Sequence, residues 1–264
     1  DPAEIAKYLK ANSVDTVMEP LTWFLTGMEK HSDEYREDLL GNSEAFIGAM
    51  KTHMRSLHMS ALQSAMNELS NHDHSRFLTR TNHKVGRISY AGAEAASEGV
   101  NPAVMREAVA IQMTWPGAPT VYYGDEAGLC GFTDPDNRRT YPWGREDYQM
   151  IDFHRVMIRI HKNYEVLKTG SLGFLWNDYQ GLCYARFSRK EQLIVIINNQ
   201  AESRDVEIQL WQAGISRLAD TKLKRIVVTS AEGFTEEPEE YTATAGILKI
   251  TMPAFGAMVL HHKN

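Results

Sequence analysis

Three short segments of the sequence carry side chains whose types and spacing suit ligand binding or catalysis. The first is Asn71-His72-Asp73, which follows an apolar stretch ending at Leu69. A histidine beside an aspartate presents a hydrogen-bond donor and a charged acceptor to the same polar ligand. The same tripeptide is also typical of a helix N-cap, where side chains accept hydrogen bonds from backbone amides. The tripeptide alone leaves a binding site and a helix cap as open alternatives.

The second segment is GAPTVYYGDEAG, residues 117–128. It predicts a short buried strand at Thr120–Tyr123, whose carboxyl end is followed by Asp125 and Glu126. In α/β barrels, functional side chains gather where strands end and loops begin. The alternative is an ordinary turn in which the two acidic side chains accept hydrogen bonds from the backbone.

The third segment is GFTDPDNRRTYPW, residues 131–143. Its Asp134-Pro135-Asp136 sequence predicts a rigid turn, because proline fixes the backbone φ angle. Two arginines follow, and a guanidinium group can form paired hydrogen bonds with carboxylates or sugar hydroxyls. A solvated charged loop is the alternative. Aromatic side chains, on which sugar rings stack well, favour the binding interpretation: Phe132, Tyr141 and Trp143.

Composition excludes several other classes of function. The 264 residues carry a net charge of −6, which argues against a surface for nucleic acid. No apolar run approaches the roughly 18 residues that a membrane span needs, and we expect no signal peptide at the start. The GxGxxG, GxxxxGK[ST], HExxH, CxxC and GxSxG patterns are all missing. The two cysteines, Cys130 and Cys183, are expected to be free thiols.

The first 166 residues predict alternating strands and helices. Helical periodicity covers 43–64, with Ser43 as the cap, and 147–164. A further helix is expected to begin at Asn101-Pro102 and to end before Pro116. Short strands are expected between the helices, and this alternation is typical of an α/β fold with parallel strands: Thr16–Met18, Ala65–Leu69 and Thr120–Tyr123. Residues 80–100 are expected to form a long loop at the rim of a site.

After about Leu167 the hydrophobic period changes to two. Six segments alternate in this way, separated by glycine and asparagine turns, which predicts a small antiparallel sandwich: 182–187, 192–198, 205–210, 225–229, 247–251 and 257–262. We therefore predict two domains, 1–166 and 167–264.

In order and spacing, the three segments resemble the α-amylase superfamily, glycoside hydrolase family thirteen, and in particular its cyclomaltodextrinase, neopullulanase and oligoglucosidase members. Asn71-His72-Asp73 resembles the last catalytic motif of that family, and 117–128 resembles its eighth barrel strand. Residues 13–25 resemble the sixth strand and its loop, although Met18-Glu19-Pro20 departs from the usual pattern. The resemblance implies an α/β fold: the C-terminal part of a (β/α)₈ TIM barrel, about strands 6–8, followed by an all-β antiparallel domain.

The resemblance also implies a reaction. The family cleaves α-glucosidic bonds with retention, using an aspartate nucleophile and a glutamate acid/base. Their motifs follow the fourth and fifth barrel strands: GxRxDxxxH, and a glutamate shortly before an aromatic residue. No segment of the chain resembles either of these two strand-end motifs, so the chain resembles the C-terminal half of such an enzyme and is expected to be inactive alone. The resemblance assigns roles to six residues: Asp73 stabilises the transition state, His72 binds the same glucose, Asp134 and Arg138 bind the next sugar toward the non-reducing end, and Tyr123 and Glu126 shape the pocket floor.

The expected partners are an α-glucan and the N-terminal half of the barrel, on the same or a separate polypeptide. The helices at 43–64, 101–115 and 147–164 would then cover a sheet completed by that half. No metal site is evident, and any calcium ion would be held mainly by upstream residues. The substrates implied are maltooligosaccharides or cyclomaltodextrins. Glucosyl transfer and a non-catalytic sugar-binding or interaction domain are the alternatives, and the sequence leaves linkage, oligomeric state and compartment open.

Overall fold

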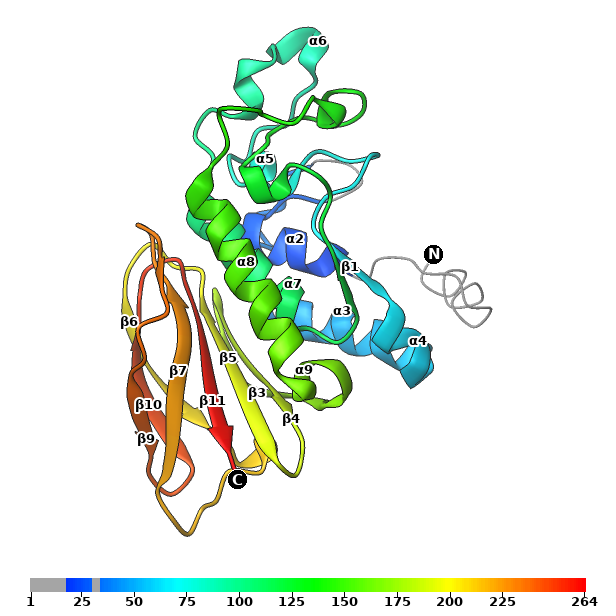
Figure 1. Ribbon diagram of the computed structural model, residues 1–264. Coiled ribbons are helices and arrows are strands. Elements are labelled where there is room, and N and C mark those ends of the chain that lie inside the picture. Colours follow the sequence, from blue (N-terminus) through cyan, green and yellow to red (C-terminus); the bar gives the residue numbers. More distant parts are fainter. Residues whose placement is uncertain (1–17, 30–33) are drawn as a thin grey trace.

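The computed structural model describes residues 18–29 and 34–264 (Figure 1). Helices dominate the described chain up to Thr169, and strands dominate from Ser171 onward. In Figure 1, helices α7 (Pro102–Thr114) and α8 (Tyr148–Asn163) lie against a large antiparallel sheet. The short strand β1 (Met66–Glu68) lies on the side of the helices away from that sheet. All three candidate segments therefore belong to the helix-rich part of the chain, before Thr169.

Eight α-helices are described, and most of them are short. They are α2 (Glu19–Thr26), α3 (Ser43–Ser56), α4 (Met59–Ser64), α5 (Phe77–Arg80), α6 (Ile88–Ala91), α7 (Pro102–Thr114), α8 (Tyr148–Asn163) and α9 (Glu165–Thr169). Four short 3₁₀ helices accompany them: η1 (Glu94–Ala96), η2 (Asp125–Ala127), η3 (Asp136–Arg138) and η4 (Trp211–Ala213). Within the described ranges, no helix has the length and apolar character required to cross a membrane.

Side-chain caps set the starts of the long helices. The Asn101 side chain accepts hydrogen bonds from the first amides of α7, and Pro102 is the first helical residue, as predicted. For α3 the predicted cap is wrong by one residue, because Asn42 accepts the amide hydrogen of Ala45 and Ser43 is already helical. The expected single helix over 43–64 is also wrong: Leu57 and His58 have extended backbone angles and divide it into α3 and α4.

Several predicted boundaries need correction. Of the strand expected at Thr16–Met18, residues 16 and 17 lie outside the described chain, and Met18 directly precedes α2. A helix is favoured there because Pro20 occupies the first turn, where its missing N–H costs nothing. The strand expected at 120–123 lies earlier, at β2 (Ala118–Thr120). The loop expected over 80–100 contains α6 and η1.

The strands after Ser171 form one seven-stranded antiparallel sheet and one two-stranded sheet. The large sheet has the order β3-β4-β5-β11-β7-β8, with β9 paired to β7, and β10 pairs with β6. The bounds are β3 (Ser171–Asp178), β4 (Gly181–Phe187), β5 (Glu191–Asn198), β6 (Arg204–Gln209), β7 (Thr221–Thr229), β8 (Phe234–Thr235), β9 (Glu240–Ala243), β10 (Ile247–Met252) and β11 (Gly256–Lys263). The six strands predicted from alternation are present, and β3, β8 and β9 were not predicted.

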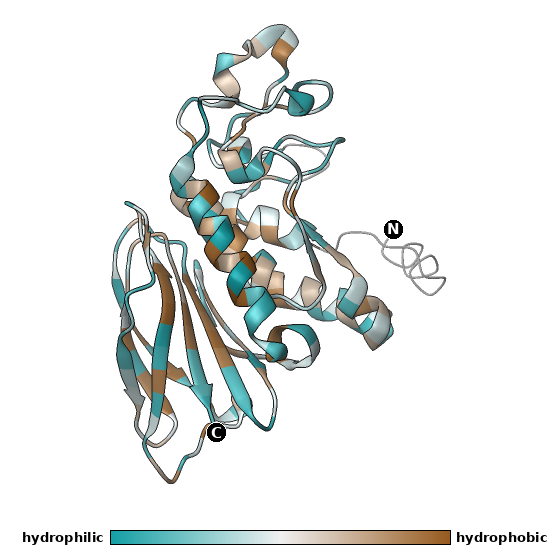
Figure 2. Cartoon of the chain, viewed as in Figure 1, coloured by the Kyte–Doolittle hydropathy of each residue, from teal (hydrophilic) through white to brown (hydrophobic). Residues whose placement is uncertain are grey.

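The large sheet is buried on both faces, as its alternating apolar side chains require. Leu193 and Val195 of β5 belong to the cluster that includes the helices, whereas Ile194 and Ile196 face β6 and β10. Figure 2 shows hydrophobic residues along these strands and along the helices beside them. The helices were expected to cover a sheet completed by the N-terminal half of the barrel. That expectation is incomplete, because α7 and α8 also pack on the large C-terminal sheet of this chain. The division into domains 1–166 and 167–264 stays a prediction.

Side-chain contacts hold the C-terminal end of α7 against strand β4. The Trp115 ring is fully buried and meets Tyr184 edge-on at a centroid distance of 5.1 Å. The hydroxyl oxygens of Thr114 and Tyr184 lie 2.5 Å apart. Arg186, which is also buried, donates a 2.9 Å hydrogen bond to the carbonyl of Thr114. These polar contacts lie inside the hydrophobic cluster and fix the position of the helix on the sheet.

Glu107 on α7 is an unusual feature of this cluster and leads to a prediction about stability. The side chain is fully buried, and neither carboxyl oxygen has a hydrogen-bond partner in the described chain. Burial raises its pKa well above the usual value, and nearby Arg106 only partly opposes this. A raised pKa in the folded state means that folding takes up a proton. Stability is therefore highest below the unfolded pKa of about 4.3 and falls as the pH rises through the folded pKa.

We expect Glu107→Leu to increase the free energy of unfolding at pH 8 by about 1–3 kcal/mol, because it removes an unsatisfied buried carboxyl group. The gain should shrink at pH 4. Urea unfolding of the 264-residue chain at the two pH values measures both effects. Glu202→Leu, at an exposed position, is the matched control and should change stability by less than about 0.5 kcal/mol. A loss of stability in Glu107→Leu at pH 8 would contradict the prediction.

Candidate active site

Strands β1 (Met66–Glu68) and β2 place two of the three candidate segments at the same end of a small parallel sheet. Their register pairs Met66 with Ala118 and Glu68 with Thr120. Because the strands are parallel, the loops that follow Glu68 and Thr120 leave the sheet on the same side. The first loop carries Asn71, His72 and Asp73, and the second carries Tyr123 to Glu126.

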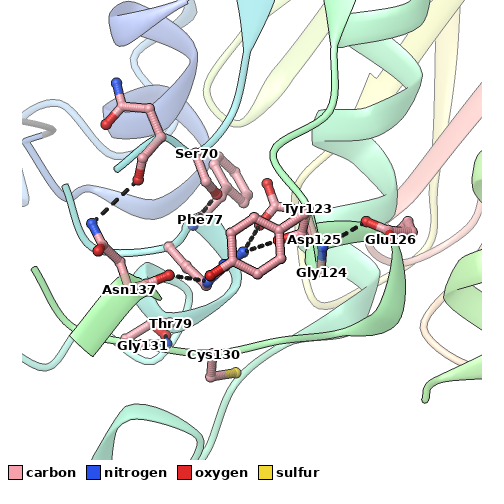
Figure 3. Close-up of polar contacts among 12 residues, drawn as sticks. Ser70, Phe77, Thr79, Tyr123, Gly124, Asp125, Glu126, Cys130, Gly131 and Asn137 are labelled. Atoms are coloured by element: carbon pink, nitrogen blue, oxygen red, sulfur yellow. Dashed lines mark hydrogen bonds and ion pairs between the residues drawn. The ribbon is translucent and has the colours of Figure 1, made fainter. Parts of the chain in front are cut away.

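Arg76 holds these loops together from a fully buried position. Figure 3 shows the residues of this contact region, with Tyr123, Asp125 and Asn137 among those labelled. Its Nη1 atom donates to Oδ1 of Asp125 and to the carbonyl oxygen of Tyr123, both at 2.9 Å. Its Nε atom donates to the carbonyl oxygen of Asn137, also at 2.9 Å. The guanidinium group also lies over the rings of Tyr122 and Tyr123, 4.5 and 5.0 Å from their centroids. One arginine thus connects all three segments.

Asp125 is buried and interacts with Arg76, so it is largely shielded from solvent. The residue is 4% exposed, and its carboxylate forms a salt bridge with Arg76. Burial raises the pKa of Asp125 to about 6, although Arg76 and a hydrogen bond from Ser70 act in the opposite direction. Removing either member of this pair would leave the other charge buried without its partner, which is strongly destabilising. Asp125 is therefore a structural residue of the site.

The third segment supports the Asn71–His74 turn from its buried side. The Nδ2 atom of Asn137 donates to the carbonyls of Asn71 and His74, at 3.2 and 2.7 Å. Thr133 donates from its hydroxyl to the carbonyl of Asp73 at 2.9 Å. These bonds hold the backbone beneath Asp73 and bring the loop that carries Asp134 beside it.

His72 and Asp73 point into solvent from this supported turn. Their side chains are 59% and 62% exposed, with Nε2 of His72 3.3 Å from Oδ1 of Asp73. The cap-like hydrogen bond at this turn comes from Asn71, whose Oδ1 accepts the amide hydrogen of Asp73 at 2.9 Å. The next helix, α5, begins only at Phe77. The helix-cap alternative is therefore wrong for His72 and Asp73, and both side chains are available to a ligand.

The two arginines of the third segment have different partners. Arg139 forms a paired interaction with the buried carboxylate of Asp136, at 2.8 Å for each of its two hydrogen bonds. Asp136 also accepts the amide hydrogen of Phe132. Arg138 instead donates from Nε to Oδ1 of Asp134 at 2.5 Å, and both side chains are about half exposed. Arg139 and Asp136 therefore stabilise the loop, whereas Asp134 and Arg138 form a preassembled polar pair at the surface.

Tyr123 and Glu126 are both engaged in holding loops. The Tyr123 hydroxyl donates to the carbonyl of Arg139 at 2.8 Å, and 41% of the residue remains exposed. Glu126 accepts the amide hydrogen of Gly124 at 2.8 Å, which matches the turn alternative for this acid. Their assignment to the floor of a pocket stays a prediction. Within the described ranges, no three His, Cys, Asp or Glu side chains come together as a metal site would require. Both cysteines are free, as predicted, and the structure buries both.

Comparison with known proteins decides the family. Residues 1–212 match the family model described as the catalytic domain of alpha amylase. The chain belongs to the α-amylase family. It is 33% identical to an amylopullulanase of Thermoanaerobacter thermohydrosulfuricus over 163 residues, which cover 55% of this chain and 10% of that protein. It is 29% identical to neopullulanase 2 of Thermoactinomyces vulgaris over 264 residues, which cover 96% of this chain and 38% of that protein.

Solved structures agree with the family at the level of fold. An α-amylase from Geobacillus thermoleovorans, crystallised with acarbose, superposes with a TM-score of 0.74 at 18% identity; the match covers all of this chain and 51% of that one. A debranching enzyme from Nostoc punctiforme superposes with a TM-score of 0.68 at 23% identity, over 92% of this chain and 46% of that one. This member of the family thus spans about half the length of these neighbours, and between 10% and 38% of four curated relatives.

Proposed function

We propose that the complete protein is a retaining α-glucan hydrolase that acts on maltooligosaccharides or cyclomaltodextrins. In this proposal the chain supplies the C-terminal part of the catalytic domain, and β1 and β2 are the seventh and eighth strands of its barrel. Support comes from the family match and from relatives named amylopullulanase, neopullulanase and cyclomaltodextrinase. The observation that carries the proposal is the exposed His72–Asp73 pair on a turn supported by two neighbouring loops.

Asp73 is proposed to stabilise the transition state. Cleavage of a glycosidic bond passes through a sugar ring with oxocarbenium character, which carries positive charge near the anomeric carbon. A fixed carboxylate interacts more strongly with that charge than with the neutral substrate, and such a difference accelerates the reaction. The bonds from Thr133 and Asn137 to the turn keep Asp73 in place, so little reorganisation is needed during the reaction.

His72 and the Asp134–Arg138 pair are proposed to bind sugar hydroxyls. His72 lies beside Asp73 and would contact the same glucose unit. Asp134 accepts and Arg138 donates hydrogen bonds, so together they match adjacent hydroxyl groups of the next glucose toward the non-reducing end. Because that unit lies away from the broken bond, its contacts contribute to binding rather than to the chemical step.

The test compares wild type with Arg138→Ala in the complete protein. Wild type should hydrolyse maltooligosaccharides with retention of the anomeric configuration, measured by NMR of the first product. Arg138→Ala should raise KM about tenfold for maltooligosaccharides, from the loss of about 1.5 kcal/mol of charged hydrogen bonding. Its effect should be much smaller for a substrate with one glucose on the non-reducing side of the bond.

Two outcomes would contradict the proposal. Net inversion, or no cleavage of any α-glucan by the complete protein, would exclude the proposed function. Equal damage to long and short substrates together with reduced thermal stability would assign Arg138 to loop support. Arg155→Ala is the matched control, since Arg155 forms a comparable exposed salt bridge, with Asp152, on α8. Kinetic constants of this control should stay at wild-type values.

A further inference from the structure

A pair of aromatic rings lies on the same loop as Arg138 but outside the contacts described so far. The centroids of the Tyr141 and Trp143 rings are 4.6 Å apart, and the ring planes are tilted by 49°. Trp143 is 79% exposed, whereas the other four tryptophans of the chain are buried or half-buried. A tryptophan that faces solvent contributes little to the hydrophobic core, and its exposed ring face is free to contact a ligand.

The ring pair is held in a defined position. The amide of Trp143 donates to the carbonyl of Tyr141, and the amide of Arg145 donates to that of Pro142, both at 2.8 Å. Tyr141 also lies within electrostatic range of Glu126, which accepts the amide hydrogen of Gly124 in the loop that follows β2. The turn is therefore tied to the loop that follows β2, and its outer ring presents an open face. Ordering this surface in advance lowers the entropic cost of binding a ligand.

The chemistry of the surface fits a sugar chain. Glucose presents C–H groups on the faces of its ring and hydroxyls around the edge, so it can stack on an indole while its hydroxyls stay hydrated or bonded. Arg145 follows Trp143 by two residues and is exposed, so the same turn also carries a hydrogen-bond donor. Trp143 lies five residues after Arg138, and five residue steps span at most about 18 Å. The rings therefore lie within reach of a ligand that extends outward from the Asp134–Arg138 pair.

We propose that Tyr141 and Trp143 form a stacking platform for the distal glucose units of an α-glucan, beyond the unit bound by Asp134 and Arg138. This proposal rests on the proposed function and deepens it, because the platform would make the enzyme prefer long substrates. Binding on an exposed ring should contribute affinity without changing the chemical step, which takes place at the other end of the substrate. Loss of the platform should therefore raise KM for long substrates and leave kcat unchanged.

The first experiment measures kinetics of the complete protein with maltoheptaose and maltotriose. Trp143→Ala should raise KM for maltoheptaose roughly three- to tenfold, in line with the usual strength of stacking contacts, and should leave KM for maltotriose within twofold. The control is Tyr179→Ala, which removes a 60% exposed ring at the β3–β4 connection and should change neither value. An equal rise of KM for both substrates would overturn the platform.

The second experiment is a tryptophan fluorescence titration with maltoheptaose in the Asp73→Asn background, where turnover is slow. Maltoheptaose should change the emission, and Trp143→Phe should abolish most of that change. No change, or an identical change in Trp143→Phe, would overturn the proposal; this would also be the result if another part of the complete protein covered the ring. A complete protein that cleaves no α-glucan would disprove the proposed function, while the titration would still decide on the platform.

Discussion

Asp73→Asn in the complete protein is expected to reduce kcat by a factor on the order of 10²–10⁴, with a much smaller change in KM. The substitution keeps the size of the side chain and the supported turn beneath it, but removes the negative charge that would face the oxocarbenium-like transition state. The loss therefore appears in the chemical step. Steady-state kinetics on maltooligosaccharides separates the two constants.

A matched control uses an aspartate with similar exposure and no proposed role. Asp152 is 59% exposed and forms a salt bridge with Arg155 on the surface of α8. Asp152→Asn should leave kcat unchanged. If Asp73→Asn raised KM while kcat stayed at the wild-type value, Asp73 would be a ground-state contact and its assigned role would be wrong.

The sequence predicted the elements around the site better than it predicted their ends. The helix that begins at Asn101 was predicted correctly because side-chain capping and a proline at the first position are local signals. The break between α3 and α4 has no such signal, since Leu57 and His58 are compatible with a helix. Nothing in the local sequence showed that the helices would pack on the sheet made by the last third of the chain, because that contact links residues far apart in sequence.

Residues that hold the site were harder to predict than residues exposed in it. Arg76 stands three residues after Asp73, and sequence alone gave no reason to bury it. Its partners come from two other loops, at Asp125 and Asn137, so its role depends on a juxtaposition that only the fold creates. Local spacing also left Arg138 and Arg139 equivalent. The structure distinguishes them because Asp136 is buried and takes Arg139, which leaves Arg138 to pair with Asp134 at the surface.

The largest expected effect is a complete loss of activity when the 264 residues are tested alone. Retaining cleavage needs a nucleophile and an acid/base whose carboxyl groups are about 5 Å apart across the bond. This sequence contains the proposed supporting carboxylate, Asp73, but neither motif that carries the other two groups. Electrostatic support from one carboxylate cannot replace bond formation at the anomeric carbon or protonation of the leaving group.

The measurement uses the purified chain and a nitrophenyl maltoside or maltotriose, with release of nitrophenol or glucose followed over hours. Near-UV circular dichroism supplies the control for folding, because Trp115 and Tyr184 pack edge-on in the core and should give a signal only when the chain is folded. A folded chain without activity, alongside an active complete protein, is the expected result. Saturable cleavage by the folded chain would mean that its own carboxylates include a nucleophile and an acid/base, and the assignment of Asp73 to a supporting role would have to be abandoned.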